Sequence, residues 1–232
     1  MIRISNLIKT FSGNTVIDNL NLIIKDGEIT ALVGHNGAGK STLIRLISGL
    51  YKADSGKIEM GSNIKIGVLL GGDINLYGNL TAYEIIRYFG KLHNVDDVTL
   101  TERIEKLDSV LKFNSFLHKR ARTFSRGMKQ KIGLVISIIH DPDILLLDEP
   151  STGLDLEASN DVINFIKYLK TENKTILIAT HNLFEICDLS DNIVFIGEGR
   201  IQKIVTTKMF FDNCPPDEKS AYLIKAMKGG ST

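Results

Sequence analysis

The feature that most constrains the fold is a glycine-rich segment placed between two apolar stretches. Residues 34–42 read GHNGAGKST, which fits the pattern GxxxxGK[ST]. The segment follows the apolar run ITALV and precedes LIRLISGL, in which apolar residues recur at helical spacing. A strand that turns through glycines into a helix directs several backbone N–H groups toward one point, where a phosphate group can lie. The sequence therefore predicts a phosphate-binding loop between a strand and a helix.

The side chains of this loop indicate how a nucleotide would be held. We expect Lys40 to reach the β- and γ-phosphates, and the Ser41 hydroxyl to coordinate Mg²⁺, an ion that prefers oxygen ligands. A glycine-rich turn that binds nothing is the alternative, and the flanking strand and helix argue against it. The other residues expected to line the phosphates are Gly34, His35, Asn36, Gly37, Ala38, Gly39 and Thr42.

A second motif places two acids at the end of an apolar strand. Residues 144–150 read ILLLDEP. Ligands of open α/β sheets bind beyond the carboxyl ends of the strands, so we expect Asp148 to share the Mg²⁺ with Ser41. Glu149 is then placed to orient or deprotonate the water that attacks the γ-phosphate. Taken alone, the same letters would describe a strand followed by a solvated turn.

Short apolar runs alternate with stretches of helical period, which predicts an α/β fold with a mixed, partly parallel sheet. Strands are expected over residues 2–11, 15–24, 29–33, 65–70, 144–147, 175–179 and 193–196. The first two should form an antiparallel hairpin, the start of an antiparallel β subdomain. Helices are expected over residues 40–48, 81–92, 100–112, 125–139 and 156–170, with a polar break at HNVDDV between the second and third.

These elements predict one domain with three parts. Residues 1–75 and 141–205 should form the α/β core of a P-loop NTPase, and residues 76–140 should form a helical subdomain inserted into it. Residues 206–232 are interpreted as a C-terminal tail of two short helices on either side of a Cys-Pro-Pro sequence.

Composition and charge exclude several classes of protein. The chain has 232 residues, of which 43% are hydrophobic, and 28 basic residues stand against 27 acidic ones. The hydrophobic content argues against a disordered chain. The near-equal numbers of basic and acidic residues argue against binding of nucleic acid by the charge of the whole surface. The two cysteines, Cys187 and Cys214, form no CxxC pair and favour a reducing cytoplasm. Apolar runs stay far below the roughly 18 residues that cross a bilayer, so a membrane function would need another chain.

Together with SRGMKQ at residues 125–130 and HN at residues 181–182, the two motifs resemble the ATP-binding subunit of an ABC transporter, from residue 2 to about residue 205. The resemblance implies an ATP hydrolase that uses ATP and Mg²⁺ and powers a separate transmembrane permease, with no nucleic acid as partner. It also implies a homodimer or heterodimer of nucleotide-binding subunits, peripheral at the cytoplasmic face of the membrane. The sequence SRGMKQ resembles the signature segment of export-type members of the family.

The family resemblance assigns further residues to the nucleotide site. Ser125 and Gly127 match the LSGGQ-type signature that covers the ATP of the other subunit, although Arg126 and Met128 replace a glycine and the glutamine. His181 matches the histidine that contacts the γ-phosphate. Residues 151–155, STGLD, match the D-loop, which crosses the subunit interface. Each also has an ordinary interpretation, because Ser and Asp often cap helices and a lone His is often structural.

The family resemblance also assigns residues to the adenine end of the site and shows that one expected residue, a glutamine, is missing. Phe11 matches the aromatic position that stacks on adenine, and Val16 is assigned to the same site; a Phe that ends a strand can equally belong to the core. Where relatives carry a glutamine after the strand, this chain has Gly71, Gly72 and Asp73. Asp73 could replace the oxygen ligand, and a flexible turn is equally consistent with the sequence.

Two other functions remain open at this point. One is a soluble ABC ATPase without transport, such as one in iron–sulfur cluster assembly. The other is an ABC protein that acts on nucleic acid, but such relatives carry long coiled-coil insertions or two ATPase units, and this chain has neither.

Overall fold

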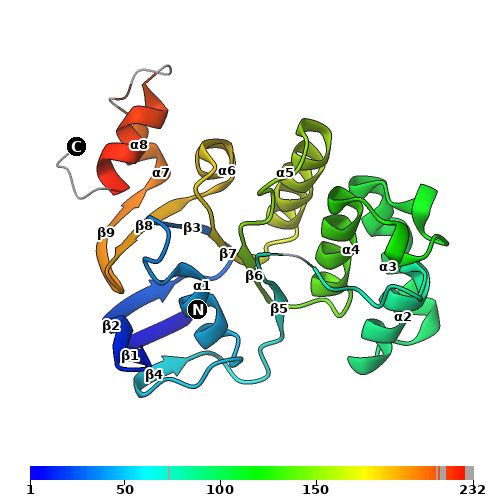
Figure 1. The fold of residues 1–232 in the computed structure, drawn as a ribbon, viewed down its shortest axis with the longest axis horizontal. Helices are drawn as coiled ribbons and strands as arrows, with labels where there is room; N and C mark the ends of the chain where they lie inside the picture. The colour runs from blue at the N-terminus through cyan, green and yellow to red at the C-terminus, as the bar shows by residue number, and fades with distance from the viewer. Residues whose placement is uncertain (73, 213, 215–217, 228–232) are drawn as a thin grey trace.

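The computed structural model describes residues 1–72, 74–212, 214 and 218–227. Figure 1 shows a large central sheet, a small sheet formed near the N-terminus, helix α1 between the two, and a group of helices at one end. Asp73, for which the sequence left an oxygen ligand and a flexible turn as alternatives, lies outside the described residues.

The large sheet has six strands in the order β5-β6-β7-β3-β8-β9. The pairs from β5 to β8 are parallel, and only β8–β9 is antiparallel. The central strands β3, β6 and β7 are buried along their whole length, as expected for parallel strands covered on both faces. The bounds are β5 (Ile66–Leu69), β6 (Ile144–Asp148), β7 (Thr175–Ala179), β3 (Ile29–Val33), β8 (Asn192–Gly197) and β9 (Arg200–Thr206).

The small sheet is antiparallel, in the order β2-β1-β4, with β1 (Ile2–Phe11), β2 (Asn14–Ile24) and β4 (Ser55–Glu59). Ser12 and Gly13 form the turn of the predicted hairpin, at φ 48° and 85°. Positive φ at both central residues is what a type I′ turn requires, and its twist matches that of the strands. Asp18 ties this sheet to the large one, because its N–H donates to the Gly199 carbonyl at 3.0 Å and its carboxylate pairs with Arg200 at 2.6 Å.

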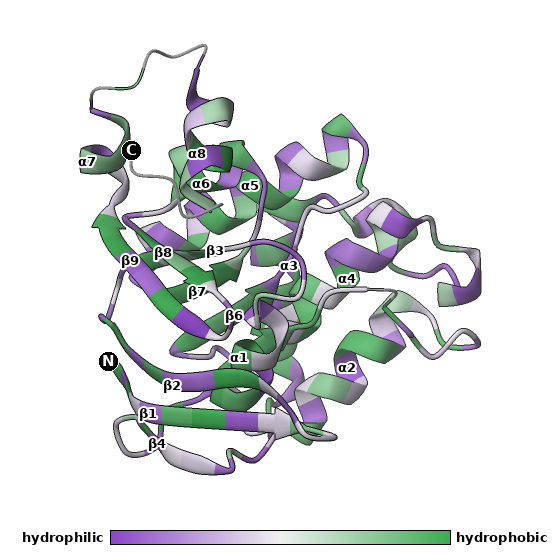
Figure 2. Ribbon diagram, turned by 60° about the vertical axis from the view of Figure 1, so that its left-hand side comes forward, coloured by the Kyte–Doolittle hydropathy of each residue, from purple (hydrophilic) through white to green (hydrophobic). Residues whose placement is uncertain are grey.

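Alternate residues of each central strand supply the two cores. Ile144 and Leu146 pack with α1 and the small sheet, whereas Leu145 and Leu147 pack with the helices on the other face. In Figure 2 the apolar colour is concentrated on these strands, and the outer helices carry both colours. The helices are α1 (Lys40–Ile47), α2 (Ala82–Leu92), α3 (Asp97–Leu111), α4 (Arg126–Ile138), α5 (Leu156–Thr171), α6 (Leu183–Leu189), α7 (Thr207–Phe211) and α8 (Lys219–Met227), with short 3₁₀ turns at Asn114–Phe116 and Ala121–Thr123.

The α/β fold with a mixed sheet, an antiparallel part and inserted helices is confirmed, and the predicted tail does contain two short helices. The third helix was predicted too short: α3 begins at Asp97, within the predicted polar break. Asp96 is the reason, because its carboxylate accepts hydrogen bonds from the Val98 and Thr99 N–H groups and so caps the helix. Strands β4 and β9 and helix α6 were not predicted. Helices α2–α4 fall within residues 76–140, while the exact limits of the three parts stay a prediction.

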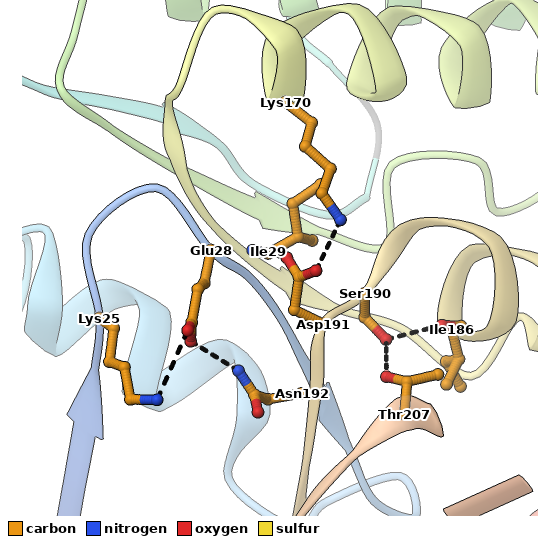
Figure 3. Close-up of polar contacts among 9 residues, drawn as sticks. All are labelled: Lys25, Glu28, Ile29, Lys170, Ile186, Ser190, Asp191, Asn192 and Thr207. Atoms are coloured by element: carbon orange, nitrogen blue, oxygen red, sulfur yellow. Dashed lines mark hydrogen bonds and ion pairs between the residues drawn. The ribbon is translucent and has the colours of Figure 1, made fainter. Parts of the chain in front are cut away.

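Polar contacts fix the amino-terminal edge of the large sheet (Figure 3). The Asp191 carboxylate accepts a hydrogen bond from the Ile29 N–H at 2.9 Å and pairs with Lys170 at 2.6 Å. Beside it, Glu28 accepts from the Asn192 side chain at 2.7 Å. These contacts join the starts of β3 and β8, at the edge of the sheet opposite to the one where β3 runs into the glycine-rich loop.

Candidate functional site

The glycine-rich loop lies where β3 ends and α1 begins, as predicted. Gly39 is the N-cap of α1, with φ 104° and no side-chain cap, so no side chain occupies the first N–H groups of the helix. Gly37 also has positive φ, and an added Cβ there would meet open space. A Cβ on Gly34 would instead collide with the Ile196 carbonyl of β8. The backbone therefore curls tightly against the sheet and leaves its helix end open for an anion.

Lys40 is folded into this loop. Its ammonium donates to the carbonyls of Gly34 and His35, at 2.7 and 3.2 Å, and the residue is only 7% exposed. Burial lowers the pKa of Lys40, and the negative charges of Glu149 and Asp148 oppose that shift. The structure thus brings the predicted lysine and both predicted acids into one electrostatic environment.

The rest of the loop surrounds this lysine. The Ala38 N–H donates to the His35 carbonyl at 3.1 Å, which closes the turn, and His35 Nδ1 lies 2.8 Å from the Asn36 carbonyl oxygen. Ser41 and Thr42 form the first turn of α1 and are half-buried. The nine residues 34–42 are therefore contiguous around one helix end.

The two acids at the end of β6 differ in their surroundings. Asp148 is buried, and its Oδ1 has no hydrogen-bond partner in the described structure. Glu149 has left-handed backbone, with φ 50°, which its N–H supports by donating to the Ala179 carbonyl of β7 at 2.8 Å. Its Oε1 lies 3.3 Å from Nδ1 of His181, so the predicted base and the predicted switch histidine are neighbours.

The hairpin of the small sheet reaches the same loop. A Cβ on Gly39 would lie 3.0 Å from the Val16 carbonyl oxygen, so the backbone of Val16 packs against the loop. Phe11 is 38% exposed, and its ring packs edge-on against Tyr51 with a centroid distance of 5.4 Å. The Lys9 ammonium lies 5.1 Å from the Phe11 ring centroid. One predicted residue therefore touches the loop, and the other is an accessible aromatic ring at the end of β1.

The signature segment begins helix α4. The Ser125 hydroxyl caps the helix by accepting from the Met128 N–H at 3.3 Å, and a Cβ on Gly127 would lie 3.1 Å from that of Ala158 in α5. The Arg126 guanidinium covers Gly153 of the segment 151–155. Within the described residues these contacts are all with the α4–α5 side of the molecule, so the chain does not bring its own Ser125 and Gly127 onto its own Lys40.

Gly71, the first of the three residues at which the family resemblance led us to expect a glutamine, lies directly beside Asp148. A Cβ added to Gly71 would be 3.2–3.3 Å from the Asp148 carbonyl oxygen, Cγ and Oδ2. A side chain there would crowd the buried carboxylate. Close packing is therefore a physical reason for glycine at this position.

Sequence reasoning missed three polar residues around the acids. Gln130 Nε2 donates to the Pro150 carbonyl at 2.5 Å, which links α4 to the end of β6. Thr180 and Glu185 are almost fully buried behind His181, with 2% and 1% exposure. Glu185 carries no sequence signal, because the two acids in LFEICDL are typical of the exposed face of a short helix.

Comparison with known proteins decides the family. The family model described as ABC transporter matches residues 17–152, more than half of the chain. The chain belongs to the ABC transporter family. A model of an AAA domain also matches a shorter stretch, residues 119–188.

Relatives of this ABC protein match it along most of their length. The ABC transporter ATP-binding protein NatA of Bacillus subtilis is 37% identical over 195 residues, 80% of this chain and 79% of NatA. The lantibiotic transport ATP-binding protein SrtF of Streptococcus pyogenes is 35% identical over 208 residues, 87% of this chain and 89% of SrtF. A solved structure, described as the ATP-binding subunit of an ABC transporter, superposes with a TM-score of 0.85 at 25% identity, over 97% of this chain and 100% of that one.

The family confirms an ATP-binding subunit, an ATPase that powers transport, and it does not favour the two non-transport alternatives. ABC ATP-binding subunits work with a transmembrane permease. In the part of this ABC protein that the structure describes, no helix is both long enough and apolar enough to span a bilayer.

Proposed function

We propose that this chain hydrolyses Mg²⁺-bound ATP between the loop 34–42 of one subunit and the Ser125–Gly127 segment of another. The observation that carries the proposal is the cluster at the strand ends. There the buried Lys40 ammonium faces Asp148 and Glu149, and Glu149 lies 3.3 Å from His181. Phosphoryl transfer to water needs charge placement and water orientation more than covalent chemistry, and these groups supply both.

Ser41 and Asp148 fit the requirements of the metal. An unpaired buried carboxylate oxygen is costly, and Asp148 Oδ1 is such an atom. Oxygen donors from a hydroxyl and a carboxylate suit Mg²⁺, which usually takes few protein ligands and the phosphates of its nucleotide. When bound, Mg²⁺ would offset charge on the β- and γ-phosphates. Lys40 would supply the second cation and move from the loop carbonyls to the phosphate oxygens.

Glu149 and His181 are assigned to the attacking water and the γ-phosphate. Glu149 is half-buried and 3.3 Å from His181, so a water held by the carboxylate would lie beside the imidazole. General base catalysis requires such a carboxylate within hydrogen-bond reach of the water. The backbone N–H groups of residues 34–42 would hold the phosphates. Val16 and the exposed Phe11 ring would contact the adenine ring of ATP.

The second subunit would supply Ser125 and Gly127. The N-terminus of α4 carries the positive end of its helix dipole, and no acidic residue lies in its first turn. Because the contacts of these residues in the described structure are with α4 and α5 and not with Lys40 of their own chain, the proposed site would be complete only in a dimer. Whether the partner is a second copy or a related chain, the same surfaces would meet.

The proposed function also requires a partner in the membrane. A separate transmembrane permease would be the partner, and the subunit would act at the cytoplasmic face of the membrane. We propose outward transport, because SRGMKQ resembles the signature of export-type members. Co-purification in detergent tests the partner: a hydrophobic chain should elute with this subunit, and its consistent absence after extraction from the native membrane would contradict the permease assignment.

Glu149→Gln tests the assigned base. The substitution keeps the shape of the side chain but removes its basicity, so ATP hydrolysis should fall about 100-fold or more while ATP binding is kept. Lys40→Ala should lower nucleotide affinity as well as turnover, because it removes the buried cation. Calorimetry with Mg²⁺-ATP and a phosphate-release assay separate the two effects.

The control is Lys174→Ala, which removes a lysine paired with Asp141 at 2.5 Å. Lys174 directly precedes β7, so it lies at the strand starts, opposite the strand ends that carry the acids. It should leave both readouts unchanged. Wild-type turnover in Glu149→Gln would reject the assigned base, and unchanged ATP affinity in Lys40→Ala would reject the role of that lysine.

A further inference from the structure

Glu185, in α6, is a buried carboxyl that makes no hydrogen bond in the described structure. The residue is 1% exposed, both carboxylate oxygens are buried without a hydrogen bond of good geometry, and no ion pair involves it among the described residues. Burial raises the pKa of Glu185, and the hydroxyls of Ser151 and Thr180 partly offset this effect. Nothing in the roles assigned so far uses this carboxyl.

The hydrogen bonds around Asn182 show what Glu185 could do. Asn182 Oδ1 accepts from the Phe184 N–H at 3.0 Å, which fixes the orientation of the amide. Its Nδ2 then donates to the Ser151 hydroxyl at 3.1 Å, and its backbone N–H donates to the Thr180 hydroxyl at 2.9 Å. Both hydroxyls therefore accept from the residue that follows His181.

Each of these hydroxyls has one proton left to donate. Glu185 lies in the first turn of α6, which Asn182 caps, and its carboxyl is near enough to both hydroxyls for them to influence its pKa, although it hydrogen-bonds neither in the described structure. A carboxylate has acceptor capacity for two such donors. Ser151 opens the segment 151–155, two residues after Glu149, whereas Thr180 immediately precedes His181. The carboxyl thus lies at the point where the chain segments that carry Glu149 and His181 come together.

From this arrangement we infer that Glu185 is a positioning residue for ATP hydrolysis: in the assembled site its carboxyl would accept from Ser151 and Thr180, hold Asn182 and thereby fix His181 against Glu149. The inference rests on the proposed roles of Glu149 and His181. Such a residue would align His181 and the attacking water with the γ-phosphate. Its loss should affect turnover more than ATP binding, because a small displacement of the reacting groups lowers the rate strongly.

Glu185→Gln tests the inference with a side chain of the same shape. Its amide nitrogen cannot accept a hydrogen bond, so one of the two hydroxyls loses its acceptor. We expect kcat for ATP to fall about tenfold, with KM for Mg²⁺-ATP within about twofold of wild type. A purely structural role would lower Tm without this split between kcat and KM.

A second variant and a cycle keep the test decisive if Glu185→Gln folds poorly. Ser151→Ala removes only one hydroxyl and should also lower kcat with KM unchanged. If the two residues act through one network, the double variant should lose no more than about tenfold, whereas independent residues would multiply their losses. Multiplied losses, or wild-type kcat in both single variants, would overturn the inference.

Ser190→Ala is the matched control. Ser190 is the C-cap of the same helix, is buried, and bonds the Ile186 carbonyl at 2.6 Å and the Thr207 hydroxyl at 2.8 Å, away from the acids (Figure 3). It should lower Tm and leave kcat unchanged. Glu149→Gln is measured in parallel: if it keeps full turnover the proposed function fails, and if only Glu185→Gln and Ser151→Ala keep full turnover the inference alone fails.

Discussion

At the scale of single residues, the site concentrates opposite charges around one buried lysine. Burial in the loop lowers the pKa of Lys40, and the negative charges of Glu149 and Asp148 oppose that shift. Asp148 retains an oxygen without a partner, which is an energetic cost that bound metal would remove. Bound Mg²⁺ would therefore stabilise the arrangement.

Gly71→Ala tests how closely the Asp148 carboxylate is packed. The new Cβ would lie 3.3 Å from Cγ and Oδ2 of Asp148 and should displace the carboxylate. We expect the Mg²⁺ concentration that gives half-maximal ATPase activity to rise several-fold, by the order of 1 kcal/mol in metal binding. A magnesium titration of the ATPase rate measures it.

Gly61→Ala is the control for this substitution, because a Cβ there would make only an ordinary contact with Ile64 at 3.5 Å. It should keep the wild-type magnesium dependence. An unchanged requirement in Gly71→Ala would mean that Asp148 is not the ligand or that the turn yields without cost.

The sequence was most informative where a motif dictates backbone shape. The loop 34–42 and the acids 148 and 149 were predicted from residue type and position, and the histidine at 181 from the family resemblance. In the structure both acids act on the charge of Lys40, and Glu149 lies beside His181. Glu185 and Thr180 could not be predicted, because their relation to His181 depends on how α6 packs against the ends of β6 and β7. Gly71 was recognised as a departure from the family, but its contact with Asp148 required coordinates.

At the scale of secondary structure elements, strongly periodic segments were predicted and weakly periodic ones were missed. Strand β4 reads SGKIE, has one half-buried residue, and is the outer strand of the small sheet, so its sequence lacks an apolar pattern. Strand β9 is also an edge strand and is mostly exposed. Helix α6 has seven residues and gives too little sequence for a helical period.

Two stacked histidines form a junction between the end of α2 and strand β5. His93 and His140 lie 4.0 Å apart between ring centroids, and His140 Nε2 lies 3.2 Å from the Ile66 carbonyl oxygen of β5. Burial, followed by the charge of His93, lowers the pKa of His140. Protonation would place a proton on the buried Nδ1, which has no partner in the described structure.

This junction predicts a loss of stability in mild acid. Since the unfolded chain protonates His140 near pH 6.5 and the folded chain does so only at lower pH, the unfolded state binds more protons and the free energy of unfolding falls as the pH drops below about 7. His140→Asn keeps a donor for Ile66 but does not titrate. Between pH 7.0 and 5.5 the wild-type Tm should fall by about 2 °C or more beyond that of His140→Asn.

Differential scanning calorimetry at both pH values measures the difference. His118→Asn, at an exposed histidine, is the control and should keep the wild-type dependence. Equal slopes for wild type and His140→Asn would show that the junction does not respond to pH.

At the scale of the whole molecule, one chain presents two halves of a site on different surfaces. The loop 34–42 lies between α1 and the hairpin, and Ser125 and Gly127 lie at the start of α4 against α5. Helix α1 and the group α2–α4 are separate parts of the structure in Figure 1. A dimer in which each chain covers the loop of the other would complete both sites.

Two defective variants can separate these halves. Gly127→Asp adds a negative charge where the start of α4 should face phosphate, and Lys40→Ala removes the cation of the loop. Because a Cβ on Gly127 already lies 3.1 Å from that of Ala158, Gly127→Ala is the steric control and should be more active than Gly127→Asp.

The most direct test of the composite site is the ATPase activity of Gly127→Asp mixed with an excess of Lys40→Ala. Each variant alone should be nearly inactive, although Gly127→Asp should still bind ATP. In a mixed dimer, one site combines the intact loop of the first chain with the intact Ser125–Gly127 segment of the second. We predict that the mixture recovers part of the wild-type activity and that the wild-type specific activity rises with protein concentration. A mixture that stays inactive while mixed dimers form, or a dilute wild-type monomer with full specific activity, would contradict the account.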